Sequence, residues 1–427
     1  MKRWPNQSGT KATRSNRGQL QVSELRSSKN TGGKRLRVCE VASCYPPSRG
    51  GVERIVEAVA FRLKQEGHQV VIVTTSRGLP SGTYHQSVNG VEIYRYPEYR
   101  LPFMETAVSP GMIGQVLSQR FDVLHVHGMT PTVTDVSLLI GKVKQKPIVL
   151  SYHYDAETTG RLAVLLETAY ETFATPILQL ADVLTVLSDS YARTSNVLRR
   201  IHAELKTVPG GVDLKKFSPA PNAGNQKDPI ILFVGKIIHY KGVEYLIDAM
   251  PAVLARVPNA RLILSGRSNS QRYVRMIANR IARSSARDAI WWEDEWVDSE
   301  KLIQRLRECC VLVLPSVSRR EAFGMVLIEA MSVGKPVIAT SIPGPRDIVQ
   351  DGVNGFLVSP RDSAKLADAL VSILSDRALC MKMGRMSRRL ARQYAWDRVA
   401  TEHVRIIEAC AGHVAYLSTP TNNSKQV

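Results

Sequence analysis

The sequence predicts an α/β protein made of two doubly wound, Rossmann-like domains. Short apolar runs with the length of buried strands alternate with amphipathic stretches of helical period. This alternation occurs twice, from residue 37 and again from residue 229, and a stretch rich in Pro, Gly and Asn separates the two series. The chain has 427 residues, 44% of them hydrophobic and 22% charged, which suffices for two domains with full cores.

The first series opens with the run RVCEVASCY at residues 37–45, which we expect to be a strand. A loop with Gly50 and Gly51 follows, and residues 52–65 then show a helical period. Ligands of doubly wound sheets bind beyond the carboxyl ends of the strands, so this glycine loop should face a cleft. A Gly-Gly pair is also common in ordinary tight turns, and that alternative stays open.

Four further apolar runs are expected to complete the first sheet, at residues 91–97, 121–128, 147–153 and 183–187. The third of these runs ends on His153, and Asp155 follows two residues later. Because a side chain at the carboxyl end of a strand lies next to the cleft, His153 is a candidate functional residue. For His125 and His127 we expect packed histidines whose nitrogens bond to the backbone.

The second series starts at residue 229 with the buried strand Ile230–Val234, and Gly242 opens a helix through about Leu254. Lys236 and Lys241 flank the intervening loop. Two ammonium groups at the carboxyl end of a strand would neutralise a diphosphate. The alternative is that both are ordinary surface lysines, which is the usual state of lysine.

Residues 321–340, EAFGMVLIEAMSVGKPVIAT, carry the clearest functional pattern. Glu321 and Glu329 bracket the start of an expected helix, and Gly334 is placed to end it. The first turn of this helix has free backbone N–H groups that favour an anion, and it holds Phe323, Gly324, Met325 and Val326. Two carboxylates suit a polyhydroxylated ligand and the amides suit a phosphate, and a sugar nucleotide carries both. The alternative is that Glu321 only caps the helix and Glu329 is solvated on its outer face.

The net charge of +19 favours an acidic partner. Up to Arg37 there are ten Lys and Arg residues and one acid, Glu24, in a stretch without apolar period, so we expect residues 1–34 to be a disordered basic tail. A second basic stretch, at residues 193–206, has the pattern of an amphipathic surface helix that could contact acidic lipids or simply face solvent. A nucleic-acid-binding protein is therefore one alternative, although aromatic and basic residues do not interleave.

The six cysteines are scattered without a CxxC pair, so we expect reduced thiols and no structural zinc. The acidic run Glu293, Asp294 and Glu295 hints at a metal site but lacks an Asp-x-Asp arrangement. No signal peptide and no window of roughly 18 to 20 apolar residues is present. We expect a cytoplasmic protein that can rest as a peripheral protein on the cytosolic membrane face, and that needs neither a metal nor another cofactor.

These motifs, in this order along the chain, resemble the family 4 retaining glycosyltransferases, which have the GT-B fold. The resemblance spans about residues 36–412 and includes residues 321–339, the two-lysine loop, Gly50-Gly51 and the hinge phrase VPGGVDLKKFSP. It implies two domains facing across a cleft, with the boundary after residue 208 and a last helix at residues 395–417 that crosses back to the N-terminal domain. Residues 209–394 would form the donor domain, and residues 418–427 a loose tail.

The resemblance also implies roles for the candidate residues. Glu321 and His153 would place the donor sugar, Glu329 would bind the ribose, and Lys236 and Lys241 would grip the diphosphate. The family often has arginine where this chain has Lys236, which keeps the charge and loses the bidentate fork. The donor would be GDP-mannose or a UDP-hexose, and the acceptor a saccharide or a polyprenyl-diphosphate-linked saccharide. A sugar-nucleotide epimerase or a phosphorylase on the same fold is an alternative enzyme.

Overall fold

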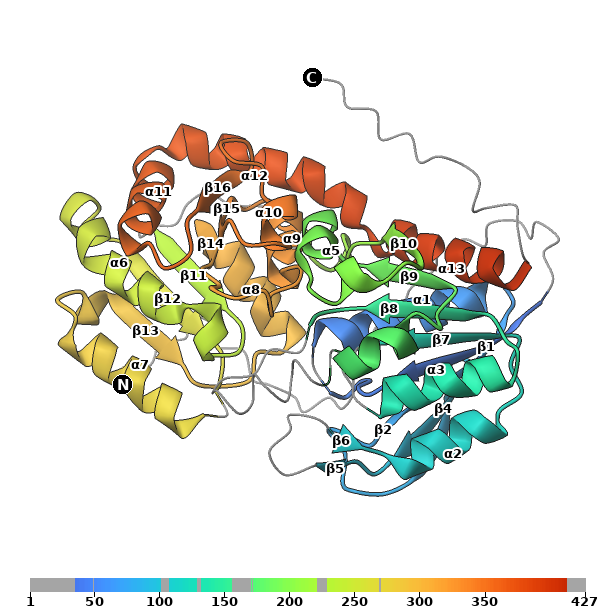
Figure 1. Cartoon of the computed structure of the whole chain (residues 1–427). Helices are drawn as coiled ribbons and strands as arrows, with labels where there is room; N and C mark the ends of the chain where they lie inside the picture. The colour runs from blue at the N-terminus through green and yellow to red at the C-terminus, as the bar shows by residue number, and fades with distance from the viewer. Residues whose placement is uncertain are drawn as a thin grey trace.

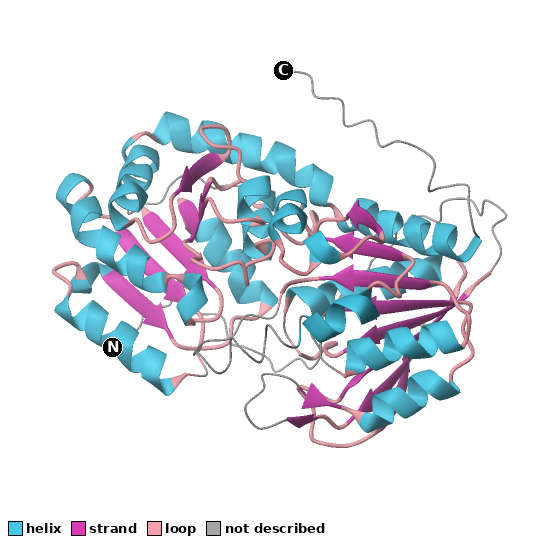
Figure 2. Cartoon of the chain, in the orientation of Figure 1, coloured by secondary structure: helices cyan, strands magenta, loops and turns pink. Residues whose placement is uncertain are grey.

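The computed structural model of the chain describes residues 35–48, 50–100, 107–128, 132–155, 170, 172–220, 229–268 and 270–412. The expected basic tail, residues 1–34, and the expected loose tail after residue 417 lie outside the described residues. Two parallel sheets, each with helices on both faces, form two domains that lie side by side (Figures 1 and 2). The predicted fold of two Rossmann-like domains is confirmed.

The N-terminal domain is built on an eight-stranded sheet with the order β10-β9-β8-β7-β1-β2-β4-β3. All neighbours pair in parallel except β3, which forms an antiparallel hairpin with β4. The strands are β1 (Arg37–Ala42), β2 (Gln69–Thr75), β3 (Tyr84–Val88), β4 (Val91–Tyr96), β7 (Val123–His127), β8 (Ile148–Tyr152), β9 (Val183–Val186) and β10 (Glu204–Thr207). A small ribbon joins β5 (Tyr99–Arg100) to β6 (Ala107–Val108). The sequence did not predict β3, because its residues are polar and half-buried or exposed.

The helices of this domain are α1 (Gly51–Gln65), α2 (Pro110–Ser118), α3 (Val133–Val143) and α5 (Asp189–Thr194). The prediction of one amphipathic helix over residues 193–206 is wrong. That stretch contains the end of α5, a short 3-10 turn at Leu198–Arg200 and the edge strand β10. Its apolar residues Val197 and Leu198 are buried in the core of the domain, so they are not available to a membrane.

The C-terminal domain has a six-stranded, fully parallel sheet with the order β13-β12-β11-β14-β15-β16. Its strands are β11 (Ile230–Val234), β12 (Arg261–Ser265), β13 (Ile290–Glu293), β14 (Val311–Leu314), β15 (Val337–Thr340) and β16 (Gly355–Val358). Its helices are α6 (Val243–Arg256), α7 (Gln271–Arg283), α8 (Ser299–Glu308), α9 (Met325–Ser332), α10 (Pro345–Ile348), α11 (Ser363–Ser375) and α12 (Arg377–Ala391). A 3-10 turn at His239–Lys241 precedes α6.

The last helix, α13 (Trp396–Gly412), returns from the C-terminal domain and packs against α1, β7 and β8 of the N-terminal domain (Figure 1). Its residues Val399, Val404 and Ile407 belong to the same buried cluster as Val38 of β1 and Ile55 of α1. The helix therefore completes one face of the first core. The predicted crossover at residues 395–417 is present up to residue 412, and residues 413–417 lie outside the described part.

Strand order sets the place of any ligand site. In the first sheet the chain runs outward from β1 in one direction and then from β7 in the other, and in the second sheet the same reversal occurs between β11 and β14. Doubly wound sheets bind ligands beyond the carboxyl ends of the strands at such a reversal. The loops that follow β1, β11 and β14 therefore mark the candidate site.

Two backbone-anchored contacts tie the domains together beside these loops. Ser190 of α5 donates its backbone N–H to Asp347 of α10 (2.8 Å), and its hydroxyl accepts from the backbone N–H of Gly344 (3.0 Å). Arg319, in the loop after β14, donates to the backbone carbonyl of Thr194. The two domains are thus in direct contact along the edge where their strand ends meet.

Candidate active site

The helix that the sequence predicts after Glu321 is present as α9, but it begins at Met325, so Phe323 and Gly324 precede its first turn. Gly324 adopts a left-handed conformation (φ +101°) just before the helix begins at Met325, and Phe323 beside it is buried. A Cβ on Gly324 would lie 3.0 Å from Leu314, so the tight approach of this turn to β14 requires glycine. The helix ends before Gly334 (φ +82°), as expected. The backbone N–H groups of Met325 and Val326 lie in the first turn, where an anion is favoured.

Glu321 and Lys241 form an ion pair in this loop cluster. The Lys241 ammonium donates to Glu321 Oε2, and the Ser316 hydroxyl donates to the same oxygen at 3.2 Å. Burial acts to lower the pKa of Lys241, but the neighbouring Glu321 carboxylate outweighs it and raises the pKa above its usual value. Lys241 is therefore a charged, largely desolvated ammonium at the carboxyl edge of the second sheet. Lys236, in the same loop, is exposed and has no ion pair or hydrogen bond among the described residues.

Glu329 is paired across the domain boundary. Its carboxylate is only 2% exposed and accepts from the guanidinium of Arg54, a residue of α1 in the N-terminal domain. The Glu329 charge is the main reason why the pKa of Arg54 lies above its usual value. The expected alternative of a solvated Glu329 on the outer face of α9 is therefore wrong.

The glycine loop contacts the start of α9. A Cβ on Gly51 would lie 3.1 Å from Met325 Cγ, and a Cβ on Gly210, in the hinge, would lie 2.3 Å from Met325 Sδ. A Cβ on Gly50 would lie 2.4 Å from the Glu53 carboxylate. These glycines let the first domain approach Met325 closely. The structure thus brings together the glycine loop, the α9 start and the Arg54–Glu329 pair.

His153 lies directly after β8 and is 2% exposed. Its loop is held by Asp155, whose Oδ1 accepts from the hydroxyls of Tyr152 and Ser195, both at 2.6 Å. Since β8 and β1 are parallel members of one sheet, His153 and the glycine loop lie at the same edge. Burial, and then the neighbouring histidines, hold the pKa of His153 well below its usual range, so the imidazole is neutral. Its Nδ1 has no partner among the described residues.

A buried polar network extends from His153 into the sheet. His153 Nε2 lies 3.4 Å from His127 Nδ1, and His127 Nε2 lies 2.6 Å from Glu40 Oε2. The Glu40 carboxylate also accepts a hydrogen bond from His125 Nδ1 at 3.0 Å, and the other ring nitrogen of His125, Nε2, lies 2.8 Å from the Ser151 hydroxyl. His125 and His127 are packed as expected, but their partners are side chains and not the backbone.

The ligand atoms of Glu40, His125 and His127 lie within 4.8 Å of one another, so a metal ion has to be considered. Two ligands of one tetrahedral zinc, each about 2.0–2.2 Å from the metal, are about 3.3–3.6 Å apart. The contacts of Glu40 with the two imidazoles, at 3.0 and 2.6 Å, are shorter and have hydrogen-bond lengths. We therefore assign these contacts as hydrogen bonds.

The acidic run after β13 is engaged in ion pairs. Glu293 pairs with Arg305 and with Lys301 (3.4 Å), and its carboxylate accepts from the Ser265 hydroxyl at 2.8 Å. Burial acts to raise the pKa of Glu293, but Arg305 outweighs it and the pKa lies below its usual value. Glu295 also pairs with Lys301. Glu293 and Glu295 therefore belong to an ion-pair network with Lys301 and Arg305. All six cysteines are free, as expected.

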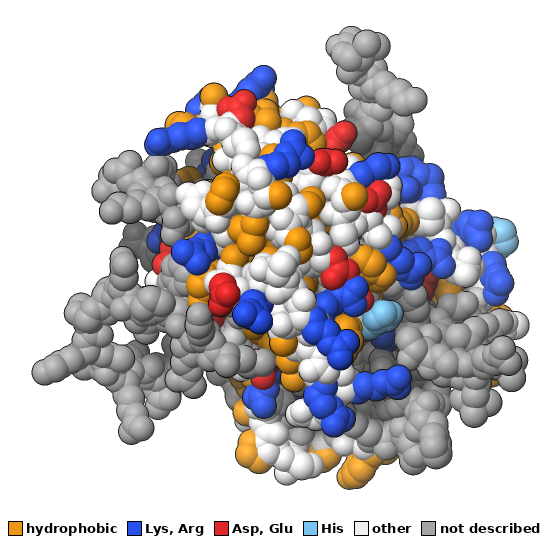
Figure 3. Space-filling view, turned by 90° about the vertical axis from the view of Figure 1, so that its left-hand side faces the viewer, with side chains coloured by type: hydrophobic (Ala, Val, Ile, Leu, Met, Phe, Trp, Pro, Cys, Tyr) orange, Lys and Arg blue, Asp and Glu red, His pale blue; other side chains and the backbone are white. Residues whose placement is uncertain are grey.

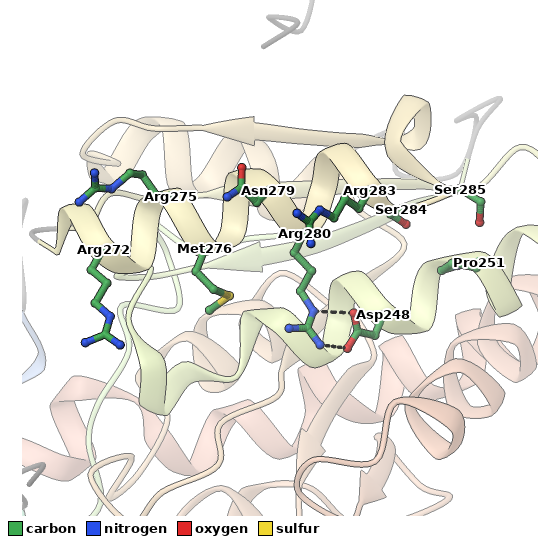
Figure 4. Close-up of a pocket in the computed structure, with 10 residues that line it drawn as sticks. All are labelled: Asp248, Pro251, Arg272, Arg275, Met276, Asn279, Arg280, Arg283, Ser284 and Ser285. Atoms are coloured by element: carbon green, nitrogen blue, oxygen red, sulfur yellow. Dashed lines mark hydrogen bonds and ion pairs between the residues drawn. The ribbon is translucent and has the colours of Figure 1, made fainter.

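A groove of about 900 Å³ lies elsewhere, on the outer face of the second domain between α6 and α7 (Figure 4). Arg272, Arg275 and Arg283 of α7 line it, and Arg280 also lines it but is paired with Asp248 of α6. This face of the molecule carries many Lys and Arg side chains (Figure 3). None of the candidate catalytic residues lines the groove, so we separate this arginine groove from the candidate active site.

Two parts of the site were not predicted from the sequence. Arg54 stands three residues after Gly51 in the first turn of α1, which a cleft-facing glycine loop could have indicated. Glu40 is an acid at an inward position of an otherwise apolar strand, and such a position demands a buried partner.

Comparison with known protein families identifies the class of enzyme. Residues 49–216 match the protein family "Glycosyltransferase Family 4", and residues 215–390 match the family "Glycosyl transferases group 1". The protein is a glycosyltransferase of the GT-B type. More narrowly, the chain belongs to the family 4 glycosyltransferases, which confirms the resemblance of its motifs.

Relatives and solved structures agree with this assignment. A phosphatidyl-myo-inositol mannosyltransferase of Mycobacterium leprae is 28% identical over 85% of this chain and 94% of its own length. An uncharacterised glycosyltransferase of Methanocaldococcus jannaschii is 27% identical over 87% and 97%. The structure of sucrose-phosphate synthase from Thermosynechococcus elongatus has a TM-score of 0.71 at 22% identity, covering 87% of this chain and 98% of that one. Anabaena HepE in complex with UDP-glucose has a TM-score of 0.68 at 17% identity, covering 88% and 100%.

Proposed function

We propose that the protein is a retaining glycosyltransferase that moves a hexose from a nucleotide-diphosphate sugar to a saccharide or lipid-linked acceptor. The observation that carries this proposal is the buried Lys241–Glu321 pair at the start of α9, next to the strand reversal of the second sheet. A desolvated ammonium and the first-turn amides of α9 suit the diphosphate of a donor. The Glu321 carboxylate beside them suits the sugar hydroxyls.

The role of each residue follows from its chemistry. Negative charge builds on the diphosphate as the bond to the sugar breaks, and Lys241, Lys236 and the α9 amides would stabilise it. Glu321 and His153 would orient the sugar, and Glu329 would accept from the ribose hydroxyls. The acceptor would attack from the face that the diphosphate leaves, which retains the anomeric configuration. We assign no protein nucleophile, because the residues that the structure describes offer no second carboxylate paired with Glu321 for a double displacement.

We propose that the reaction needs no metal ion, because the cationic groups of this chain take the place of a metal at the leaving diphosphate. We expect the initial rate in excess EDTA to equal the rate in added Mg²⁺. Loss of activity in EDTA that Mg²⁺ or Mn²⁺ restores would contradict this part of the proposal.

Substitutions test the site. Lys241→Met should lower the transfer rate by at least about a hundredfold, since electrostatic contacts to a leaving group are typically worth that much. Glu321→Gln and His153→Ala should each lower it by about tenfold or more, because each removes a hydrogen bond that orients the sugar. Lys301→Met is the matched control, because it removes an ion-paired lysine of the same domain outside the site. If all three variants kept rates within a few-fold of the control, the site assignment would be wrong.

The donor can be identified with the purified protein. Two observations guide the choice of candidates: mannosyltransferases are among the relatives, and one structural neighbour binds UDP-glucose. We propose GDP-mannose as the first candidate and a UDP-hexose as the second. Thermal-shift screening with GDP-, UDP- and ADP-sugars should show one that raises the melting temperature in the parent and not in Lys241→Met. NMR of the product then reports the anomeric configuration.

For the acceptor we propose a saccharide linked to a lipid diphosphate, reached at an anionic membrane surface. No helix among the described residues is long and apolar enough to cross a bilayer. We propose that contact with the membrane depends on charge and that the arginine groove, which is exposed and cationic, supplies it (Figures 3 and 4).

Vesicle sedimentation tests the membrane proposal. Binding to phosphatidylglycerol vesicles should exceed binding to phosphatidylcholine vesicles and should weaken as salt is added. Replacing Arg272, Arg275 and Arg283 by Glu should reduce binding much more than an equal charge change on α12. The matched control replaces Lys382, Arg385 and Arg389 by Glu. Absence of binding at low and high salt, or equal losses in the two variants, would reject the groove as the membrane contact.

A further inference from the structure

We propose that Glu40 and His127 are positioning residues that hold His153 in one tautomer, with the proton on Nε2 and a free lone pair on Nδ1. His153 would then accept a hydrogen bond from a hydroxyl of the bound sugar. The second half of this inference rests on the proposed function, and the first half does not.

The three side chains form a continuous line across neighbouring strands. Glu40 is on β1, His127 ends β7 and His153 follows β8, and these strands pair in parallel in that order. Glu40 and His127 are completely buried. The line runs from Glu40 Oε2 to His127 Nε2 at 2.6 Å and from His127 Nδ1 to His153 Nε2 at 3.4 Å. It ends at the edge of the sheet where the glycine loop lies.

Protonation fixes the direction of each hydrogen bond. Burial acts to raise the pKa of Glu40, but its two imidazole partners outweigh it and hold the pKa at about 2, so Glu40 is a carboxylate. A carboxylate only accepts, and His127 Nε2 must therefore carry a proton. Burial, and then His125, lower the pKa of His127 to about 4, so this imidazole is neutral and its Nδ1 is a bare acceptor.

The same rule then applies to His153. Since His127 Nδ1 accepts, His153 Nε2 must donate, and a neutral imidazole has only one N–H. The remaining nitrogen, Nδ1 of His153, is therefore an acceptor. It is buried and has no partner among the described residues, which leaves it free for a donor from the ligand. A sugar hydroxyl is such a donor.

The network contains its own control. His125 donates to the same Glu40 carboxylate, but its other nitrogen leads to the hydroxyls of Ser151 and Thr185 and not to His153. His125→Gln removes a comparable buried imidazole from the network and leaves the line to His153 intact. If Glu40 had a purely structural role, His125→Gln and His127→Gln would affect His153 equally.

The tautomer can be measured without any ligand. The full-length protein is labelled with ¹⁵N at histidine, and the signals of His153 are assigned by their loss in His153→Gln. We expect a single Nε2–H tautomer for His153 in the parent and in His125→Gln. Glu40→Gln should give a mixture of tautomers, because a neutral amide can both donate and accept. His127→Gln should do the same and serves as the second variant if Glu40→Gln does not fold.

The donor supplies the second readout. With UDP-glucose or GDP-mannose as the probe, Glu40→Gln should raise KM by up to about tenfold, the value of one neutral hydrogen bond. His125→Gln should leave KM unchanged. A His153 tautomer that is Nδ1–H in the parent, or that does not change in Glu40→Gln and His127→Gln, would overturn the inference. Failure of the proposed function would appear differently, as a parent protein that uses no nucleotide sugar while the tautomer result still holds.

Discussion

Acidification should destabilise the N-terminal domain, because neutral histidines are buried in its core, and one of them lies on α13. His403, on α13, is 2% exposed, and neither of its ring nitrogens has a partner among the described residues. Burial, followed by the charges of His125 and His127, lowers the pKa of His403 to about 3. The pKa of His127 is lowered to about 4, again mainly by burial. His153 is shifted in the same direction.

The sign of the effect follows from proton linkage. In the unfolded chain these imidazoles take up a proton near their usual pKa of about 6.5. In the folded protein they do so only well below pH 5. The unfolded state therefore binds more protons in this window, and the free energy of unfolding falls as the pH falls. Between about pH 7.5 and about pH 5, His127 and His403 should each remove about 2 kcal/mol of stability. Because domains are typically stable by only about 5–15 kcal/mol, this loss is large.

The variant His403→Leu isolates one of these contributions. It should lose about 2 kcal/mol less than the parent over the same pH range, and at neutral pH it should gain about 1–3 kcal/mol because two unsatisfied buried nitrogens are removed. The assay is urea unfolding of the full-length protein, followed by far-UV circular dichroism at a series of pH values. His202→Gln is the matched control, because His202 is exposed. If His403→Leu lost stability in parallel with the parent, His403 could not be a neutral, buried imidazole.

Two further predictions concern the junction of the domains. Arg54→Gln leaves the buried Glu329 carboxylate without its partner and should lower the free energy of unfolding by about 1–3 kcal/mol. Arg54→Lys keeps the charge and should cause a smaller loss. If urea titrations gave the same stability for both variants and the parent, the pair would contribute nothing to stability. Gly210→Ala should displace Met325, because the new Cβ would lie 2.3 Å from the Met325 sulfur. This displacement should weaken donor binding, measured by isothermal titration calorimetry. The double variant Gly210→Ala/Met325→Ala should recover the affinity, and a double variant without recovery would contradict this packing explanation.

The architecture could be predicted from the sequence because it depends on local patterns. Strand length, helical period and the glycine cap at the end of a helix are set by neighbouring residues, and Gly334 adopts the expected left-handed conformation. The hairpin strand β3 was missed since its side chains do not alternate between apolar and polar. The prediction of a basic helix at residues 193–206 was wrong for a related reason. The stretch belongs to three separate short elements, and its apolar residues pack into the core.

Long-range contacts were the harder part of the site. Lys241 and Glu321 follow β11 and β14, so strand patterns place both at the carboxyl edge of one sheet, but these strands are neighbours only in the sheet order and the ion pair itself was not expected. The Arg54–Glu329 pair joins residues of different domains, so it depends on how the domains meet, and strand patterns contain no information about that. The line from Glu40 to His153 needs the order of β1, β7 and β8 in the sheet, which is not the order along the chain.

The position of α13 has a consequence for the synthesis of the chain. Val399, Val404 and Ile407, close to the end of the chain, complete a core whose other members include Val38 and Ile55 near its beginning. The ribosome releases these residues only after the whole second domain. The domain that emerges first therefore cannot complete this core until the second domain has been made, and during that interval the apolar surface that α13 later covers is open to chaperones.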